Sequence, residues 1–268
     1  MQIKIRLFAL LMLAMSCAAT QAAQWAYDPE FKPISPQEIT RLIGNPNLPG
    51  IVRDQMLSRA AVYGLLENVV VESSNQLKKR PNDPVLRSLY CYALFLANDP
   101  SVYKPQNRTE WLRQQKELSI RANRTAEYLI MNEGATVPFC WRTLAYLNLM
   151  GIADGVAKGV ERAEKAVQLN PKDLYSHRLL AYAYLKSGPT QNLSKALFHA
   201  RRATVLQPKS QGAYRHQASA YFLGKQYSSA YSALKKAESL LPPPFRDGKQ
   251  LRHYEMWAKQ SSTTPRWR

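Results

Sequence analysis

The sequence is poor in acidic residues, and the resulting positive charge favours anionic partners. Of its 268 residues, 19 are Asp or Glu and 37 are Lys or Arg, so the formal net charge is +18. Such a charge raises encounter rates with anionic partners, which include acidic protein segments, lipid headgroups, glycans and nucleic acid, and it is silent about fold. Because 46% of the residues are hydrophobic, the chain can still bury a substantial core, which excludes a disordered basic tail.

Cysteine and histidine are also scarce, which leaves little material for metal or catalytic chemistry. The chain has 3 cysteines and 4 scattered histidines, of which His177 is expected to pack between helices. Neither a Cys-x-x-Cys nor a His-Glu-x-x-His spacing occurs, and the sequence contains no Gly-rich phosphate loop and no nucleophile elbow. We therefore predict that the protein is not an enzyme and uses no metal and no cofactor.

Long apolar runs are missing after residue 23, since none approaches the roughly 18 residues that a membrane span needs. The N-terminus has a shorter one: a basic start is followed by an apolar stretch at 7–15 and by small residues up to Ala23. This order is typical of a secretory signal peptide. We predict that residues 1–23 are removed by cleavage after Ala22 or Ala23 and that the protein is periplasmic or secreted. Lipid attachment at Cys17 and a retained anchor are the less favoured alternatives.

Internal repetition is the strongest signal in the sequence. Small and aromatic residues recur at matching offsets in two segments: Ala181, Tyr184, Ala196, Ala200, Ala203 and Pro208 in the first, and Ala218, Tyr221, Ala230, Leu234, Ala237 and Pro242 in the second. The two closing prolines are 34 residues apart. Small residues let two helices approach closely, and proline ends the unit because it cannot continue a helix. A single helix pair cannot bury its apolar face alone, so the repetition predicts stacked pairs.

This pattern resembles the tetratricopeptide repeat. A third copy begins Trp141-x-x-Leu144-Ala145, and agreement is close over 137–242, although Asn148 stands where the family usually has Tyr. The resemblance implies an all-α fold, a solenoid of helix-turn-helix repeats wound as a right-handed superhelix with capping helices. It also implies a role in protein binding rather than catalysis.

The predicted organisation beyond the signal peptide has four parts. They are an N-terminal extension with a short capping helix at 24–50, an array of about five helix pairs at 51–244, a C-terminal capping helix at 245–260 and a mobile tail at 261–268. Ser35 to Glu38 resembles a capping box, with proline at the first helical position. An insertion around 99–121 lengthens the second pair and has no assigned role.

Two cysteines remain after cleavage, Cys91 and Cys140, and both fall early in the first helices of predicted neighbouring repeats. An oxidising compartment would permit a disulfide between them. The alternative is two buried thiols, because sequence spacing does not fix the geometry that a disulfide requires.

The resemblance further implies a binding surface, since the first helices of such repeats line the concave face and fixed positions on them meet the ligand. Carried over copy by copy, those positions are Arg142 and Tyr146, then Arg178, Tyr182 and Lys186, then Arg215, and less securely Arg87 and Tyr90 upstream. Three successive repeats thus carry Arg at one position. Guanidinium forks suit carboxylates, sulfates and phosphates. A solvated basic face with no dedicated ligand is the alternative.

These features predict a periplasmic interaction scaffold or adaptor for an envelope assembly, secretion, pilus or polysaccharide-export system. We expect a monomer that grips an acidic segment of a partner protein in a basic concave groove. The alternative is a binding module for an anionic polymer, with an anionic polysaccharide or lipid headgroups favoured over nucleic acid, for which no aromatic-basic motif is present. A secreted factor that acts on another cell is a third class.

Overall fold

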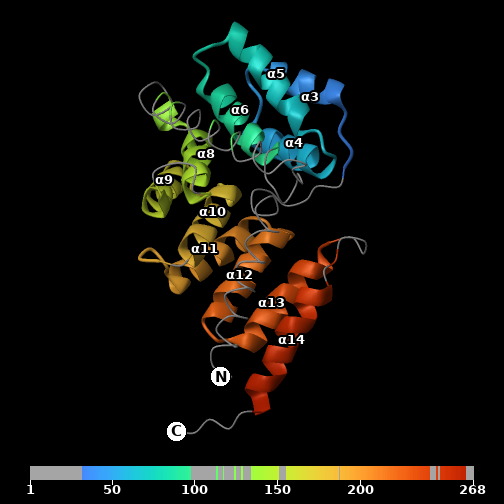
Figure 1. The fold of residues 1–268 in the computed structure, drawn as a ribbon, viewed down its shortest axis with the longest axis vertical. Helices are drawn as coiled ribbons and strands as arrows, with labels where there is room; N and C mark the ends of the chain where they lie inside the picture. The colour runs from blue at the N-terminus through green and yellow to red at the C-terminus, as the bar shows by residue number, and fades with distance from the viewer. Residues whose placement is uncertain are drawn as a thin grey trace. The chain divides into compact units, whose positions relative to one another are not determined.

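A computed structural model describes residues 32–97, 134–150, 155–186, 188–241, 246 and 248–263, and the single positions 113, 117, 124 and 128. Within these ranges the chain is helical apart from turns and has no strand, as the predicted all-α fold requires (Figure 1). The predictions for the signal peptide, the tail beyond 263 and most of the insertion at 99–121 lie outside the described residues. The chain divides into two compact units, Met1–Ala135 (unit 1) and Thr136–Arg268 (unit 2).

Unit 1 contains four well-described helices. They are α3 (Pro36–Gly44), α4 (Gly50–Val62), α5 (Leu66–Lys79) and α6 (Pro84–Ala97), and α5 packs against the other three. The first helix begins where the sequence predicts, because the Ser35 hydroxyl accepts a 3.1 Å hydrogen bond from the backbone N–H of Glu38. A buried arginine, Arg59, fastens α4 to the start of α3 with hydrogen bonds of 2.9 Å to Glu38 Oε1 and to the Lys32 carbonyl.

Unit 2 contains seven α-helices among its described residues. They are α8 (Pro138–Leu149), α9 (Gly155–Leu169), α10 (Leu174–Leu185), α11 (Leu193–Leu206), α12 (Gln211–Leu223), α13 (Tyr227–Ser239) and α14 (Gly248–Thr263). Each helix packs against the next in the sequence, and α10 also contacts both α8 and α12. The chain is therefore an all-α repeat solenoid, with α8, α10 and α12 as the first helices of successive repeats and α9, α11 and α13 as the second helices.

Alanine makes the close packing of these pairs possible. The predicted small positions are fully buried, among them Ala145, Ala163, Ala166, Ala181, Ala196, Ala200, Ala203, Ala230 and Ala237. All the buried residues of α11 are alanines, and α9 and α13 bury alanine at two and three positions, so the backbones of the second helices can approach the first helices closely. The recurrence of alanine in the sequence thus marks the interior face of each second helix.

The last helix closes the solenoid with aromatic side chains. Tyr254 of α14 stacks on Phe222 of α12 with ring centroids 4.7 Å apart, and Trp257 stacks on Tyr227 of α13 at 5.5 Å. These contacts cover apolar surface that the last repeat would otherwise expose to water. They agree with the predicted capping helix at the C-terminal end.

The departure at Asn148 from the usual tyrosine has a structural reason. Asn148 is buried in α8, and its Oδ1 accepts a 2.7 Å hydrogen bond from Nη1 of Arg162, a buried arginine of α9. Gly159 lies at the same crossing, where an added β-carbon would come within 2.8 Å of the Leu149 side chain. The pair α8–α9 therefore uses a polar contact and a glycine where the next two repeats of this chain have Tyr184 and Tyr221.

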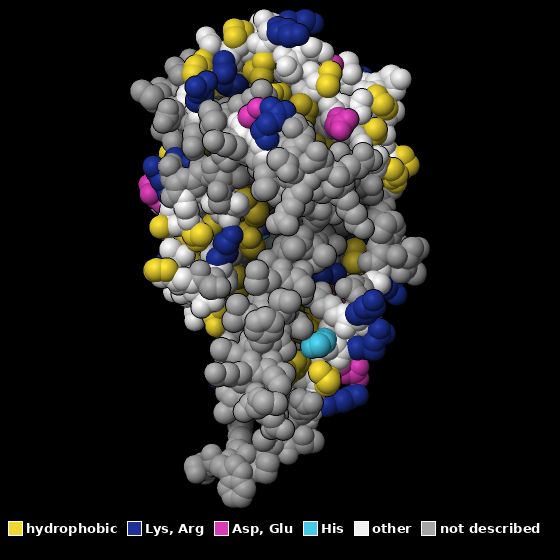
Figure 2. Space-filling view, viewed as in Figure 1, with side chains coloured by type: hydrophobic (Ala, Val, Ile, Leu, Met, Phe, Trp, Pro, Cys, Tyr) yellow, Lys and Arg dark blue, Asp and Glu magenta, His cyan; other side chains and the backbone are white. Residues whose placement is uncertain are grey.

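Positive charge exceeds negative charge among the charged side chains that Figure 2 shows, as the composition predicts. Lys and Arg side chains predominate over Asp and Glu on the described face that Figure 2 shows. None of the helices in the described ranges combines the length and the apolar character that crossing a bilayer demands.

Candidate interaction surface on the first helices of unit 2

The first helices α8, α10 and α12 carry the three arginines that the sequence singles out. Arg142, Arg178 and Arg215 occupy corresponding places on these helices. The sequence predicts that their guanidinium groups line a groove open to a partner. In the structure Arg142 and Arg178 are only 3% and 1% exposed, and Arg215 is half-buried. The contacts of each arginine explain why it is buried rather than open to a partner.

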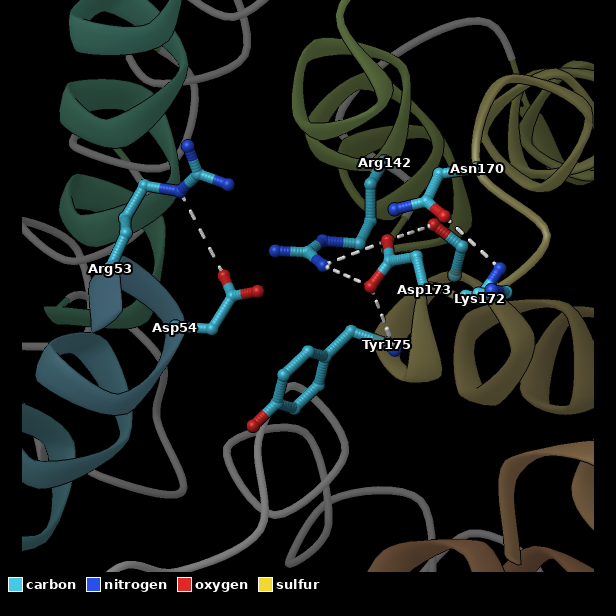
Figure 3. Close-up of polar contacts among 8 residues, drawn as sticks. Arg53, Asp54, Arg142, Asn170, Lys172, Asp173 and Tyr175 are labelled. Atoms are coloured by element: carbon cyan, nitrogen blue, oxygen red, sulfur yellow. Dashed lines mark hydrogen bonds and ion pairs between the residues drawn. The ribbon is translucent and has the colours of Figure 1, made fainter. Parts of the chain in front are cut away.

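Arg142 forms an ion pair with the next repeat. Its Nη1 lies 3.0 Å from both Oδ1 and Oδ2 of Asp173, at the start of α10, as Figure 3 shows. The guanidinium carbon also lies 5.1 Å from the ring centroid of Phe139 and 5.2 Å from that of Tyr175. Arg142 is therefore held by a carboxylate and two aromatic rings within unit 2.

Asp173 has two roles at once, because it also caps α10. Its Oδ1 accepts a 3.2 Å hydrogen bond from the backbone N–H of Tyr175, and its Oδ2 accepts a 2.5 Å bond from the Ser176 hydroxyl. Burial alone would raise the pKa of the Asp173 carboxyl, but the Arg142 charge and these hydrogen bonds outweigh it and lower the pKa below its ordinary value. The carboxylate stays ionised and joins α8 to α10.

Arg178 makes the equivalent contact with α12. Its guanidinium group lies directly on Gly212, in the first turn of α12, where a β-carbon would overlap the Nη2, Cζ and Nε atoms. The same group lies 5.7 Å from the ring centroid of Tyr175. Gly212 is required here for close approach, since any larger residue would displace the arginine.

Arg215 makes the third contact of this kind. Its Nη1 donates a 2.9 Å hydrogen bond to Oε1 of Gln250 in the first turn of α14, and its Nη2 donates to the buried Glu238 at the end of α13. Each of the three arginines thus reaches from one first helix to the beginning of a later helix: α10 for Arg142, α12 for Arg178 and the capping helix α14 for Arg215. We call Arg142, Arg178 and Arg215 the inter-repeat arginines.

The side chains next to the inter-repeat arginines differ in accessibility. Tyr146 is buried in α8, whereas Tyr182 of α10 is half-buried and stacks on the buried ring of His216 in α12 at 6.5 Å. Lys186, the C-cap of α10, is also half-buried, and its ammonium group donates to the Leu149 carbonyl and, at 3.4 Å, to the Tyr182 hydroxyl. Burial lowers the pKa of Lys186. Tyr182 and Lys186 therefore form the accessible part of this surface.

A pair of histidines lies between α10 and α11. His177 is buried, as expected, and its Nδ1 lies 2.9 Å from Nδ1 of His199. His177 Nε2 lies 3.0 Å from the Pro171 carbonyl, which can only accept, so Nε2 carries the proton and the His199 Nδ1–H donates to His177 Nδ1. Burial lowers the pKa of both rings, in His199 to about 4. Both rings are therefore neutral near pH 7.

The upstream candidates belong to unit 1. Arg87 of α6 donates a 2.8 Å hydrogen bond to the Pro81 carbonyl and lies over the ring of Tyr128, 4.0 Å from its centroid. Tyr90 is half-buried on the same helix. Cys91 and Cys140 are both buried, in α6 and α8, which belong to different units. The disulfide between them stays a prediction.

The sequence did not reveal which residues the three arginines contact. Asp173 could have been identified as a helix cap from its place two residues after Pro171. Gly212 and Gln250 carry no comparable signal, because neither residue type marks a contact with an arginine. In the described ranges, His, Cys, Asp and Glu side chains form no group of three or more that could hold a metal ion.

No family model matches this chain, and no curated protein matches it. Among solved structures it is similar to the crystal structure of MamA, with a TM-score of 0.46 and 16% sequence identity, over 69% of this chain and 93% of that chain. By its own helix packing the chain is a helical repeat protein. Its place in the tetratricopeptide family stays a prediction from its motifs.

Proposed function

We propose that this chain is an exported scaffold that binds an acidic segment of a partner protein on the first helices of unit 2, at Tyr182 and Lys186. A repeat solenoid offers an extended surface along its stacked helices, which is the usual basis of binding in such proteins. The net charge of +18 favours encounter with an anionic partner. The proposed setting is the bacterial periplasm, in an envelope assembly or export system.

The observation that carries this proposal is the environment of Lys186. Its ammonium group is half-buried and donates to a backbone carbonyl and a phenol, which are both neutral acceptors. Burial disfavours its charged form, as the lowered pKa shows. A carboxylate that approached Lys186 would favour the charged form and form a charge-assisted hydrogen bond, so an acidic side chain is the ligand that this position fits best.

Tyr182 gives the same position an apolar surface and a hydroxyl group. The Lys186 ammonium lies 5.3 Å from the Tyr182 ring centroid, and the ring stacks on His216 of the following repeat. Because Lys186 also contacts Leu149 of the preceding repeat, the site brings three successive first helices together. In this proposal Arg142, Arg178 and Arg215 fix the spacing of those helices, and Tyr146 packs beneath the surface.

The test is site-specific photo-crosslinking in cells. A benzophenone amino acid at Ser219, which is half-buried on α12 at the position that corresponds to Tyr182 on α10, is expected to capture one predominant acidic protein. The Lys186→Gln substitution is expected to lower the yield of that crosslink about tenfold, because the complex loses a charged hydrogen bond. Lys236→Gln on the exposed face of α13 is the matched control and should leave the yield unchanged.

Two outcomes would contradict the proposal. One is an unchanged crosslink in the Lys186→Gln chain, and the other is an equal loss in the Lys236→Gln control. Fractionation of the tagged full-length chain tests the compartment separately, since an exported scaffold is expected in the periplasmic fraction.

A further inference from the structure

The outward face of α11 has an unusual composition. Ala196, Ala200 and Ala203 face the interior, and the opposite side exposes Phe198 and Val205 at 64% and 69%. Seven residues separate this phenylalanine and valine, which is two helical turns, so both project from one side of the helix. Single exposed apolar side chains are common on protein surfaces, but here two large ones share one stripe on one helix.

Cations surround the two apolar side chains. Lys195, Arg201 and Arg202 are all exposed on the same face, and α11 contains no acidic residue. Arg201 is held in place by a 2.7 Å hydrogen bond from its Nη2 to the Tyr221 hydroxyl. The α11 stripe, defined as Lys195, Phe198, Arg201, Arg202 and Val205, is therefore apolar along its centre and positive at its sides.

The other second helices of unit 2 continue the positive charge. Across α9, α11 and α13 the exposed cations are Lys158, Lys165, Lys195, Arg201, Arg202, Lys235 and Lys236. Within the described parts of these helices the accessible acidic residues are Glu161 and the half-buried Glu164, whose Oε1 lies 3.8 Å from Nζ of Lys195. The excess of exposed positive charge on unit 2 thus extends over α9, α11 and α13 and is not confined to one helix.

We infer that the α11 stripe binds the surface of an anionic lipid bilayer, with Phe198 and Val205 inserted among the headgroups and the cations paired with lipid phosphates. A helix with apolar residues on its outer side and Lys or Arg beside them suits an interfacial position. Each cation near an anionic membrane surface strengthens binding by about fivefold. A nucleic acid would satisfy the cations but offers Val205 no apolar layer. This binding site is separate from the Tyr182 and Lys186 surface, so neither proposal depends on the other.

The test measures co-sedimentation of the full chain with vesicles made of equal parts of phosphatidylglycerol and phosphatidylcholine. Wild-type protein is expected to bind these vesicles, to lose binding as salt rises, and to bind pure phosphatidylcholine vesicles far more weakly. Arg201→Gln with Arg202→Gln should weaken binding about 25-fold, the product of two such cation losses. Phe198→Ser with Val205→Ser should weaken it by at least about tenfold, since two inserted side chains are lost.

Matched controls come from the exposed side of α5 in unit 1. Val71 is 59% exposed and Lys78 and Lys79 are exposed, so Val71→Ser removes an exposed apolar side chain and the pair Lys78→Gln with Lys79→Gln removes the same charge as the arginine pair. These variants should retain wild-type binding, and unchanged thermal unfolding verifies that every variant is folded. Lys186→Gln should also leave vesicle binding intact, which separates this test from that of the acidic partner.

Three results would overturn the inference. They are equal binding to neutral and anionic vesicles, equal losses in the α5 controls, and wild-type binding by the α11 variants. Binding of a polyglutamate peptide through the α11 stripe, without binding to vesicles, would instead identify a protein-docking face and reject the lipid surface.

Discussion

The guanidinium group of Arg178 lies on the backbone of Gly212, so a residue of α10 occupies the space that a side chain in the first turn of α12 would need. Arg142 and Arg215 make corresponding contacts with Asp173 and with Gln250. Arginine at a repeated position can therefore serve the stacking of repeats as well as the recognition of a ligand. The predictions below separate these roles.

The first prediction concerns the contact between Arg178 and Gly212. Gly212→Ala should destabilise the chain by about 1 to 3 kcal/mol, because the new methyl group overlaps a buried guanidinium. Urea unfolding followed by circular dichroism measures this cost. In an Arg178→Ala background the same substitution should cost much less. Equal costs in the two backgrounds would show that the overlap is relieved elsewhere.

Gly44→Ala is the matched control for that substitution. An added β-carbon at Gly44, the last residue of α3, would approach no atom closer than 3.9 Å. Alanine is the better helix former, so this variant should be as stable as the wild type or slightly more stable.

The second prediction concerns the ion pair between Arg142 and Asp173. Asn can still cap α10, so Asp173→Asn removes the charge while retaining most of the cap. We expect a loss of about 2 to 4 kcal/mol in the free energy of unfolding, because a buried guanidinium loses its carboxylate. A double-mutant cycle with Arg142→Met gives the coupling between the two side chains. Glu255→Gln in the exposed pair with Lys259 should cause no measurable change.

The third prediction concerns the buried hydrogen bond between Asn148 and Arg162. Asn148→Leu keeps a similar volume but removes the acceptor of the Arg162 Nη1 hydrogen bond. The buried guanidinium would lose a charged hydrogen bond, so the chain should lose about 2 to 3 kcal/mol of stability. Joint replacement by Leu at 148 and Met at 162 should recover part of this loss. A double variant as unstable as Asn148→Leu would contradict the explanation.

The fourth prediction concerns acid. Burial lowers the pKa of His177, of His199 to about 4, and of His216, where the Arg178 charge adds to the effect. The unfolded chain takes up protons near pH 6.5, where the folded chain does not. The stability from these rings is therefore complete above about pH 6.5 and is lost as the pH falls toward 4, by roughly 1 to 3 kcal/mol for His199.

Urea unfolding at a series of pH values between about 7 and 4 measures this dependence. His199→Asn should flatten it, because asparagine does not titrate and its amide can donate to His177 in place of the imidazole. His253→Asn on the half-exposed face of α14 is the control and should keep the wild-type slope. An unchanged slope in the His199 variant would show that other groups govern the acid response.

Much of the fold follows from local patterns that the sequence displays directly. Ala196, Ala200 and Ala203 recur at helical spacing and face the interior, and Ser35 begins α3 as a cap. Such features depend on a few adjacent residues and on helix geometry, so they can be identified without knowing what packs nearby.

The candidate site was harder to predict because the position of a long side chain depends on the next repeat. The repeat pattern places Arg142 and Arg178 on the same face of successive helices. It does not show that an aspartate and a glycine 31 and 34 residues further along receive them. The arginines are consequently buried, and the accessible cation on α10 is Lys186 at its C-terminal end.

The arrangement of the inter-repeat arginines limits how this scaffold can change its specificity. A residue that fixes the spacing between two repeats cannot be replaced to suit a new ligand without weakening the packing between those repeats. The three arginine positions are therefore poor targets for redesign. If the proposed function holds, altered selectivity should instead arise at the end of α10, where Tyr182 and Lys186 are only half-buried.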